Sequence, residues 1–114
     1  MADCLFCRII AGEIPAAVVA EDEELLAFKD INPQAPVHVL VIPKRHIANT
    51  AASVEGDELL LGRLLRFGCR VAAETGVAES GFRLVLNNGP DSGEAVPHLH
   101  LHVLGGRRLT WPPG

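Results

Sequence analysis

The feature that most limits the fold of this chain is the segment Pro97–Val103, Pro-His-Leu-His-Leu-His-Val, near its carboxyl end. Histidines alternate strictly with aliphatic residues, and an alternation of period two is typical of a β-strand with one face in the core. The pattern predicts a strand whose histidines share one face and whose aliphatic residues share the other. The histidines are His98, His100 and His102, and the core residues are Leu99, Leu101 and Val103.

The spacing of these histidines limits their chemistry. Residues two apart on a strand are separated by roughly 6.8 Å, which puts roughly 13.5 Å between His98 and His102. Bonds from zinc to nitrogen are about 2 Å long, so the three rings cannot share one zinc ion, although two neighbours can. Near neutral pH an imidazole serves as a nucleophile, a general base or acid, or a phosphate partner. Three adjacent titratable rings are costly to bury, and we predict a functional site built along an elongated ligand.

Length and charge exclude several classes of function. The 114 residues fit a single domain, residues 1–114. The net charge is −4 and there is no basic stripe, which argues against binding of a nucleic-acid polymer. No apolar run is long enough to span a bilayer, and the acidic amino terminus is unlike a signal peptide. The 3 cysteines, an odd number, do not indicate a disulfide framework. We therefore expect a cytoplasmic protein with no membrane partner.

The rest of the pattern predicts a short helix, several strands and one long helix. Asp3 and Gly12 are the expected N-cap and stop of a helix from Cys4 to about Ala11. Strands are expected over residues 16–20, 25–29, 37–42 and 82–87, and a long helix from residue 53 or 57 to residue 75. The expected fold is therefore α+β, with a five-stranded, largely antiparallel sheet, one long helix and one short helix.

The long helix carries its own expectations. Gly62 and Gly68 lower its intrinsic propensity, so close packing on a neighbour is expected to hold it. Cys69 is expected in the core. The apolar residues that recur at helical spacing, and are expected to face the sheet, are Leu60, Leu61, Leu64, Leu65, Val71 and Ala72.

Four further residues stand out for their chemistry. Cys4 and Cys7 lie three apart on one helical face, a spacing that fits either a metal or redox pair or two core-filling side chains. Asp30 opens a proline-rich loop, where it can accept hydrogen bonds from sugar hydroxyls or cap the turn. His38 shares a strand face with Leu40 and Ile42, which is unusual unless it meets other polar groups.

Three segments together resemble the histidine triad (HIT) superfamily, and within it the Hint branch of purine nucleoside phosphoramidases. These are His98–Arg107, Asp30–His38 and the terminal Trp111–Gly114. The resemblance covers essentially the whole chain and implies a homodimer whose sheets join into one. The tail, residues 105–114, is expected to pack near the dimer interface and the active site. Because an exposed tryptophan in a loose tail is unfavourable, Trp111 is expected to pack against a second subunit.

The resemblance implies a role for each site residue. His100 matches the nucleophile, which attacks the α-phosphorus of a purine nucleoside phosphoramidate and forms a nucleotidyl-histidine, later released by water. His102 matches the group that binds phosphoryl oxygens or assists the leaving group. His98 and His38 match the residues that support and orient the nucleophile. The other residues matched to nucleotide contacts are Leu5, Phe6, Ile9 and Phe28 at the base, Asp30 and Ile31 at the ribose, and Asn87, Gly93, Glu94 and Ala95 at the phosphate.

Two departures from the branch stand in the sequence. Gly93-Glu94-Ala95 replaces the usual Gly-Gln-Ser, so the hydroxyl that contacts the scissile bridge is missing and a slower or altered leaving-group preference is expected. The second departure is the Cys4-x2-Cys7 pair. It resembles HIT proteins that hold a structural zinc, whose four ligands here are Cys4, Cys7, His46 and His98. No cofactor is implied for catalysis.

Two alternatives to a phosphoramidase stay open. One is a nucleotide-binding sensor or interaction protein with low turnover, which the alanine at position 95 favours. The other is a zinc-dependent hydrolase with the metal on two strand histidines, which lacks the carboxylate or third histidine that catalytic zinc usually takes. The sequence does not choose a physiological substrate or a base.

Overall fold

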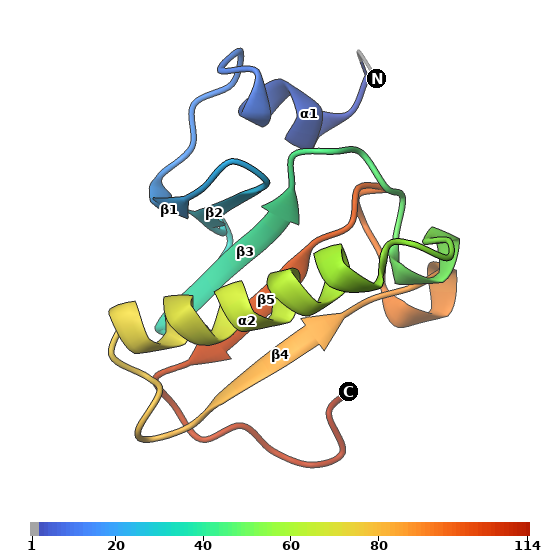
Figure 1. Ribbon diagram of the computed structural model, residues 1–114. Coiled ribbons are helices and arrows are strands. Elements are labelled where there is room, and N and C mark those ends of the chain that lie inside the picture. The colour runs from blue at the N-terminus through green and yellow to red at the C-terminus, as the bar shows by residue number, and fades with distance from the viewer. Residues whose placement is uncertain (1–2) are drawn as a thin grey trace.

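The computed structural model describes residues 3–114 and is built on one antiparallel sheet (Figure 1). The order of its five strands is β1-β2-β3-β5-β4. The strands are β1 (Val18–Glu21), β2 (Leu25–Lys29), β3 (Val37–Pro43), β4 (Phe82–Leu86) and β5 (Leu101–Gly105). The helices are the short α1 (Leu5–Ile10), the long α2 (Glu58–Glu74) and two single 3₁₀ turns, Thr50–Ala52 and Pro90–Ser92. The predicted α+β class and five-stranded sheet are confirmed.

The two faces of the sheet carry different layers. The helix α2 runs along one face (Figure 1), where it packs on Val39 and Val41 of β3 and on the aliphatic side chains of β5. The opposite face of β3 carries Leu40 and Ile42, which form a second core with Phe6 of α1. The predicted alternation of β3 is therefore confirmed, and it places His38 on the side of α1 rather than of α2.

Helix α2 approaches the sheet at a glycine. A Cβ atom on Gly68 would lie 2.7 Å from Leu101 Cδ2, so any side chain there would force Leu101 to shift, whereas a Cβ on Gly62 would meet nothing within 4 Å. Of the two glycines, Gly68 therefore provides the predicted close packing of the helix and Gly62 does not. The prediction of a buried Cys69 is wrong, since this cysteine is exposed, and Leu65 is 42% exposed. The buried stripe runs instead along Leu64, Phe67, Gly68, Val71 and Ala72.

The histidine strand is shorter than predicted, because β5 begins at Leu101. Pro43 at the end of the neighbouring β3 has no N–H to donate, and its carbonyl accepts the Nε2–H of His98 at 2.8 Å. The Leu99 amide donates to the Ile47 carbonyl at 2.6 Å instead of to a ladder partner. The predicted distribution of faces nevertheless holds, because Leu99 lies in the α2-side core while the His98 and His100 rings both contact Phe6 of α1.

Several predicted element ends shift in the structure. The N-cap of α1 is Cys4 rather than Asp3, and its Sγ accepts the Cys7 amide at 3.4 Å. The first strand covers residues 18–21 rather than 16–20, and β4 ends at Leu86, which leaves Asn87 outside the sheet. Helix α2 begins after Asp57, one of its two predicted starts, and ends before Thr75. Among residues 3–114 no helix has both the length and the apolar character needed to cross a bilayer.

Candidate active site and candidate metal centre

A largely apolar hollow of about 320 Å³ lies between α1, β2 and the segment that leads into β5. Its volume is at the lower end of the range typical of small-molecule sites. His100 and His102 stand at one side of it, and Asp30 and Ile31 lie at another part of its wall. The rest of the lining is Leu5, Phe6, Ile9, Ile14, Pro15, Ala16, Phe28, Lys29, Leu40, Ala95 and Val96.

Most of the residues matched to nucleotide contacts line this hollow. The four base-contact residues, both ribose residues, Ala95 and the two histidines all border the hollow. Asn87, Gly93 and Glu94 do not. Residues such as Lys29, Leu40 and Val96 were missed, because no local sequence signal shows which side chains the fold of α1 over the sheet brings together.

The protons on His100 are fixed by the backbone. Its Nδ1 lies 2.8 Å from the carbonyl oxygen of His98, and because a carbonyl can only accept, Nδ1 carries the hydrogen. In the neutral ring the Nε2 atom therefore keeps its lone pair. The ring packs edge-on against those of Phe6 and His102, with centroids 5.2 and 5.0 Å away. His100 thus presents an unprotonated nitrogen, the form that a nucleophilic imidazole needs.

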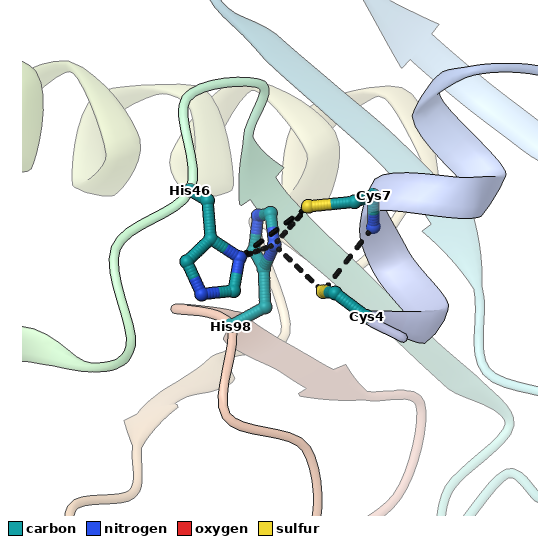
Figure 2. Close-up of side chains that lie close together, drawn as sticks. All are labelled: Cys4, Cys7, His46 and His98. Atoms are coloured by element: carbon teal, nitrogen blue, oxygen red, sulfur yellow. Dashed lines mark hydrogen bonds between the residues drawn. The ribbon is translucent and has the colours of Figure 1, made fainter. Parts of the chain in front are cut away.

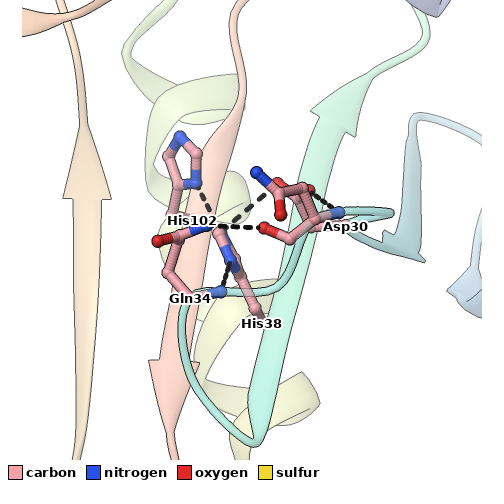
Figure 3. Close-up of polar contacts among 5 residues, drawn as sticks. Asp30, Gln34, His38 and His102 are labelled. Carbon is pink, nitrogen blue, oxygen red and sulfur yellow. Dashed lines mark hydrogen bonds and ion pairs between the residues drawn. The ribbon is translucent and has the colours of Figure 1, made fainter.

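The opposite assignment follows for His102, through a chain of hydrogen bonds shown in Figure 3. The backbone N–H of Gln34 donates to His38 Nδ1 at 3.0 Å, so neutral His38 carries its hydrogen on Nε2. That hydrogen is donated to His102 Nδ1 at 2.8 Å. His102 must then bear its own hydrogen on Nε2, which makes it a donor beside the hollow.

Asp30 caps its turn, one of the two purposes that its position suggests, and also contacts His38. One carboxylate oxygen accepts the Asn32 amide at 2.8 Å and so caps the turn, while the other lies 3.5 Å from His38 Nε2. With His38 and His102 it forms a carboxylate and two imidazoles whose ligand atoms lie within 4.8 Å of one another. A metal ion there would need the Nε2 lone pair of His38, and the ring would then point an Nδ1–H at the Gln34 N–H. This trio is therefore a hydrogen-bonded relay rather than a metal site.

Burial holds the histidines of the relay in the neutral form. It lowers the pKa of His102 to about 4, and the charges on His100 and His38 when protonated act in the same direction. Burial also lowers the pKa of His38, against an opposing effect of Asp30. Both rings are therefore neutral near pH 7, as the hydrogen-bond assignment requires.

A second cluster joins the two cysteines of the amino-terminal helix to two histidines (Figure 2). Cys4 and Cys7 come from the start of α1, His46 from the loop after β3, and His98 from the segment before β5. The distances are 3.3 Å from Cys4 Sγ to His98 Nδ1, 3.3 Å from Cys7 Sγ to His46 Nδ1, and 3.1 Å between the two Nδ1 atoms. The structure thus brings together all four residues that the resemblance matched to zinc ligands.

The chemistry of this donor set fits a structural zinc ion. Tetrahedral zinc has bonds of about 2.0–2.1 Å to nitrogen and about 2.3 Å to sulfur, so its ligand atoms lie roughly 3.3–3.8 Å apart, close to the distances in this cluster. The Nε2–H of His98 is donated to Pro43, which leaves the Nδ1 lone pair aimed at the thiols. A closed set of two sulfur and two nitrogen atoms is typical of structural zinc sites. His98 is fully buried, and its burial lowers its pKa.

The loop after β4 is held from outside the hollow. The Glu94 carboxylate accepts from Asn49 Nδ2 at 2.8 Å and from the Gly89 amide at 3.4 Å. Asn88 Oδ1 accepts the Ala51 amide at 2.8 Å. These bonds tie residues 88–94 to the turn at residues 50–52, so Glu94 supports the loop that carries Ala95 to the hollow.

A family model and a relative both match this chain to the HIT domain family. The HIT domain family matches residues 11–109. An uncharacterized HIT-like protein of Synechocystis sp. is 55% identical over 112 residues, which cover 98% of this chain and 97% of that protein.

Solved structures show the same similarity. The crystal structure of a HIT family hydrolase from Legionella pneumophila has a TM-score of 0.96 and 52% identity, and the match covers 98% of this chain and 100% of that one. A hypothetical histidine triad nucleotide-binding protein from Sulfolobus tokodaii has a TM-score of 0.77 and 33% identity, over 90% of this chain and 68% of that one.

Proposed function

The chain belongs to the histidine triad (HIT) family, and on that premise we propose that it is a hydrolase of purine nucleoside phosphoramidates. The observation that carries the proposal is the free Nε2 atom of His100, fixed by the bond from Nδ1 to the His98 carbonyl. The names of the Legionella and Sulfolobus proteins, a hydrolase and a nucleotide-binding protein, support the same class.

The reaction proceeds in two steps at phosphorus. His100 Nε2 attacks the α-phosphorus, a bond from nitrogen to phosphorus forms, and the P–N bond of the substrate breaks as the amine leaves, taking a proton from solvent water. Water then attacks the nucleotidyl-histidine, which restores the ring and releases the nucleoside monophosphate. Splitting one difficult displacement into two easier ones is the general advantage of a covalent intermediate.

His102 supplies the donor that this chemistry needs. Its Nε2–H is fixed by the relay from Gln34 through His38, so the donor is in place before negative charge develops on the phosphoryl oxygens. Since the pKa of His102 is about 4, the ring acts as a neutral donor near pH 7.

The hollow beside these histidines suits the nucleoside part of the substrate. Phe6 and Phe28 meet edge-to-face with centroids 5.5 Å apart, and they offer flat apolar surface to a purine ring. Asp30 lies where the hollow meets the relay and suits a ribose hydroxyl. A structural zinc held by Cys4, Cys7, His46 and His98 would supply rigidity and take no part in either step.

Replacement of His100 by asparagine tests the proposal. We expect the wild-type protein to release AMP from adenosine 5′-phosphoramidate and the His100→Asn variant to lose turnover by at least about 10³-fold. Binding of AMP measured by calorimetry should survive in the variant, because the pocket wall is unchanged. Equal turnover by the two proteins would refute the role of His100.

The second candidate function is a nucleotide-binding sensor with little turnover. Ala95 favours it, because this residue lines the hollow without the hydroxyl expected there. Tight binding of AMP without measurable turnover by the wild-type protein would select the sensor.

A further inference from the structure

We propose that Cys4 and Cys7, which do not line the nucleotide hollow, are positioning residues for it, because the metal they share with His46 and His98 fastens the wall that contacts the base. This inference rests on the proposed function, since it assumes that the hollow binds a nucleotide. It concerns affinity for the base and adds no step to the reaction.

The first argument is the anchoring of α1. The helix has 6 residues, and helices shorter than about 12 residues are marginal without tertiary support. Within the described residues, every hydrogen bond or ion pair from residues 4–13 to the remainder of the chain passes through Cys4 or Cys7. Apart from apolar packing, the two thiols are therefore what joins this helix to the sheet.

The second argument is the place of α1 in the hollow. Leu5, Phe6 and Ile9 all line it, whereas the phosphate end is formed by Ala95 and the histidines on other segments. Displacement of α1 would remove much of the base-contacting wall, whereas at the phosphate end it would remove only the contact of Phe6 with the His100 ring. Metal loading should therefore change affinity for ligands that carry a base more than for ligands that lack one.

Thermodynamic linkage makes this coupling reciprocal. If the metal strengthens nucleotide binding by some factor, the nucleotide strengthens metal binding by the same factor. A cluster that served only overall stability would not distinguish a ligand with a base from one without. AMP and ribose 5-phosphate are a matched pair of probes, because they share the sugar phosphate and differ in the purine.

The first experiment measures both probes on two forms of the wild-type protein, one loaded with zinc and one stripped by a chelator. Removal of zinc should raise the Kd of AMP at least about fivefold, the lower end of typical coupling between sites, and change that of ribose 5-phosphate by less than about twofold. Hydrogen exchange should show faster exchange of the α1 amides. An unchanged Kd for AMP, or equal weakening of both probes, would overturn the proposal.

Variants test the same residues without a chelator. Cys7→Ser removes one thiolate but spares Cys4, whose sulfur also caps α1. Cys69→Ser is the matched control, because this exposed cysteine lies far along the chain on α2. We expect weaker AMP binding in the first variant and wild-type binding in the second, with the sheet intact by circular dichroism. Equal AMP affinity in both variants would count against the proposal.

If the zinc-free protein unfolds, the coupling is measured in the opposite direction, as the effect of each ligand on zinc affinity. Zinc affinity is measured by competition with a chromophoric chelator, at equal saturation with AMP or with ribose 5-phosphate. The zinc affinity of the AMP-bound protein should be at least about fivefold higher than that of the protein bound to ribose 5-phosphate. Equal zinc affinities would overturn the proposal. Failure of zinc-loaded protein to bind AMP would overturn the proposed function as well, whereas AMP binding that ignores zinc would overturn only this inference.

Discussion

Three neighbouring histidines differ in chemistry because three different partners fix their protons. Pro43 takes the Nε2–H of His98, the His98 carbonyl takes the Nδ1–H of His100, and His38 donates to Nδ1 of His102. These tautomers are the ones that the proposed roles need, with His98 as a metal ligand, His100 as the nucleophile and His102 as a hydrogen-bond donor. Alternation along the chain predicted the shared face, but the roles depend on partners from other segments.

Introduction of the missing hydroxyl is the first prediction at this scale. Ala95 is exposed and lines the hollow, so Ala95→Ser should be accommodated without a change of fold. We expect turnover of adenosine 5′-phosphoramidate to rise by about 2–10-fold, because one more hydrogen-bond donor at the scissile bridge contributes roughly 0.5–1.5 kcal/mol. Measurement of kcat with several amine leaving groups checks this, and an identical rate with every leaving group would refute it.

Glu94 allows a second prediction. Glu94→Ala removes the acceptor of Asn49 and should raise KM by roughly 3–10-fold through a looser loop. Glu94→Gln is the matched control, because its amide oxygen can still accept from Asn49, and it should stay close to wild type. If Glu94→Ala also left KM unchanged, the bond to Asn49 would have no part in holding the loop.

The relay predicts how stability depends on pH. In the unfolded chain a histidine titrates near pH 6.5, whereas burial lowers the pKa of His102 to about 4 in the folded protein. Between these values the unfolded chain binds more protons than the folded protein. The contribution of His102 to the free energy of unfolding is therefore fully present above about pH 6.5 and is lost as the pH falls toward 4. Thermal melts at pH 7.5, 5.5 and 4.5 check this. His102→Gln should flatten the profile, and an unchanged slope would contradict the assignment.

At the scale of elements, the local sequence pattern predicted where strands lie and which faces they share, but not how the elements pack together. The span of β2 and the alternating faces of β3 were predicted correctly. Leu65 and Cys69 were misplaced, because helical spacing reveals an apolar stripe but not which of its flanks the sheet covers. The start of β5 was missed because His98 bonds instead to the carbonyl of Pro43, which lies 55 residues before it in the chain.

Gly68 supplies the prediction for helix α2. Gly68→Val should destabilise the protein by about 1–3 kcal/mol, because a Cβ there already lies 2.7 Å from Leu101 Cδ2 and 3.2 Å from Leu84 Cδ2. Arg66→Val, an exposed site on the same helix, is the control and should change stability by less than about 1 kcal/mol. Urea denaturation measures both variants. Similar losses in the two would show that the close approach is not what makes Gly68 necessary.

At the scale of the whole molecule, the expected homodimer stays a prediction. Leu65 and Cys69 lie four apart on a side of α2 turned away from the sheet, with Gly62 on the same side. This stripe of small and apolar residues suits packing against a second helix. Light scattering should give twice the chain mass for the wild type and one chain mass for Leu65→Asp. A wild-type monomer at micromolar concentration would refute the dimer.

Trapping of the covalent intermediate tests whether His100 is the nucleophile. The zinc-loaded protein is mixed with adenosine 5′-phosphoramidate, quenched within milliseconds to seconds, digested and analysed by mass spectrometry. We predict one adenylyl group per chain on the peptide that contains His100, carried by that residue and absent from the His100→Asn variant. An adenylyl group on another residue, or turnover with no trapped adduct at any quench time, would contradict the nucleophilic role of His100.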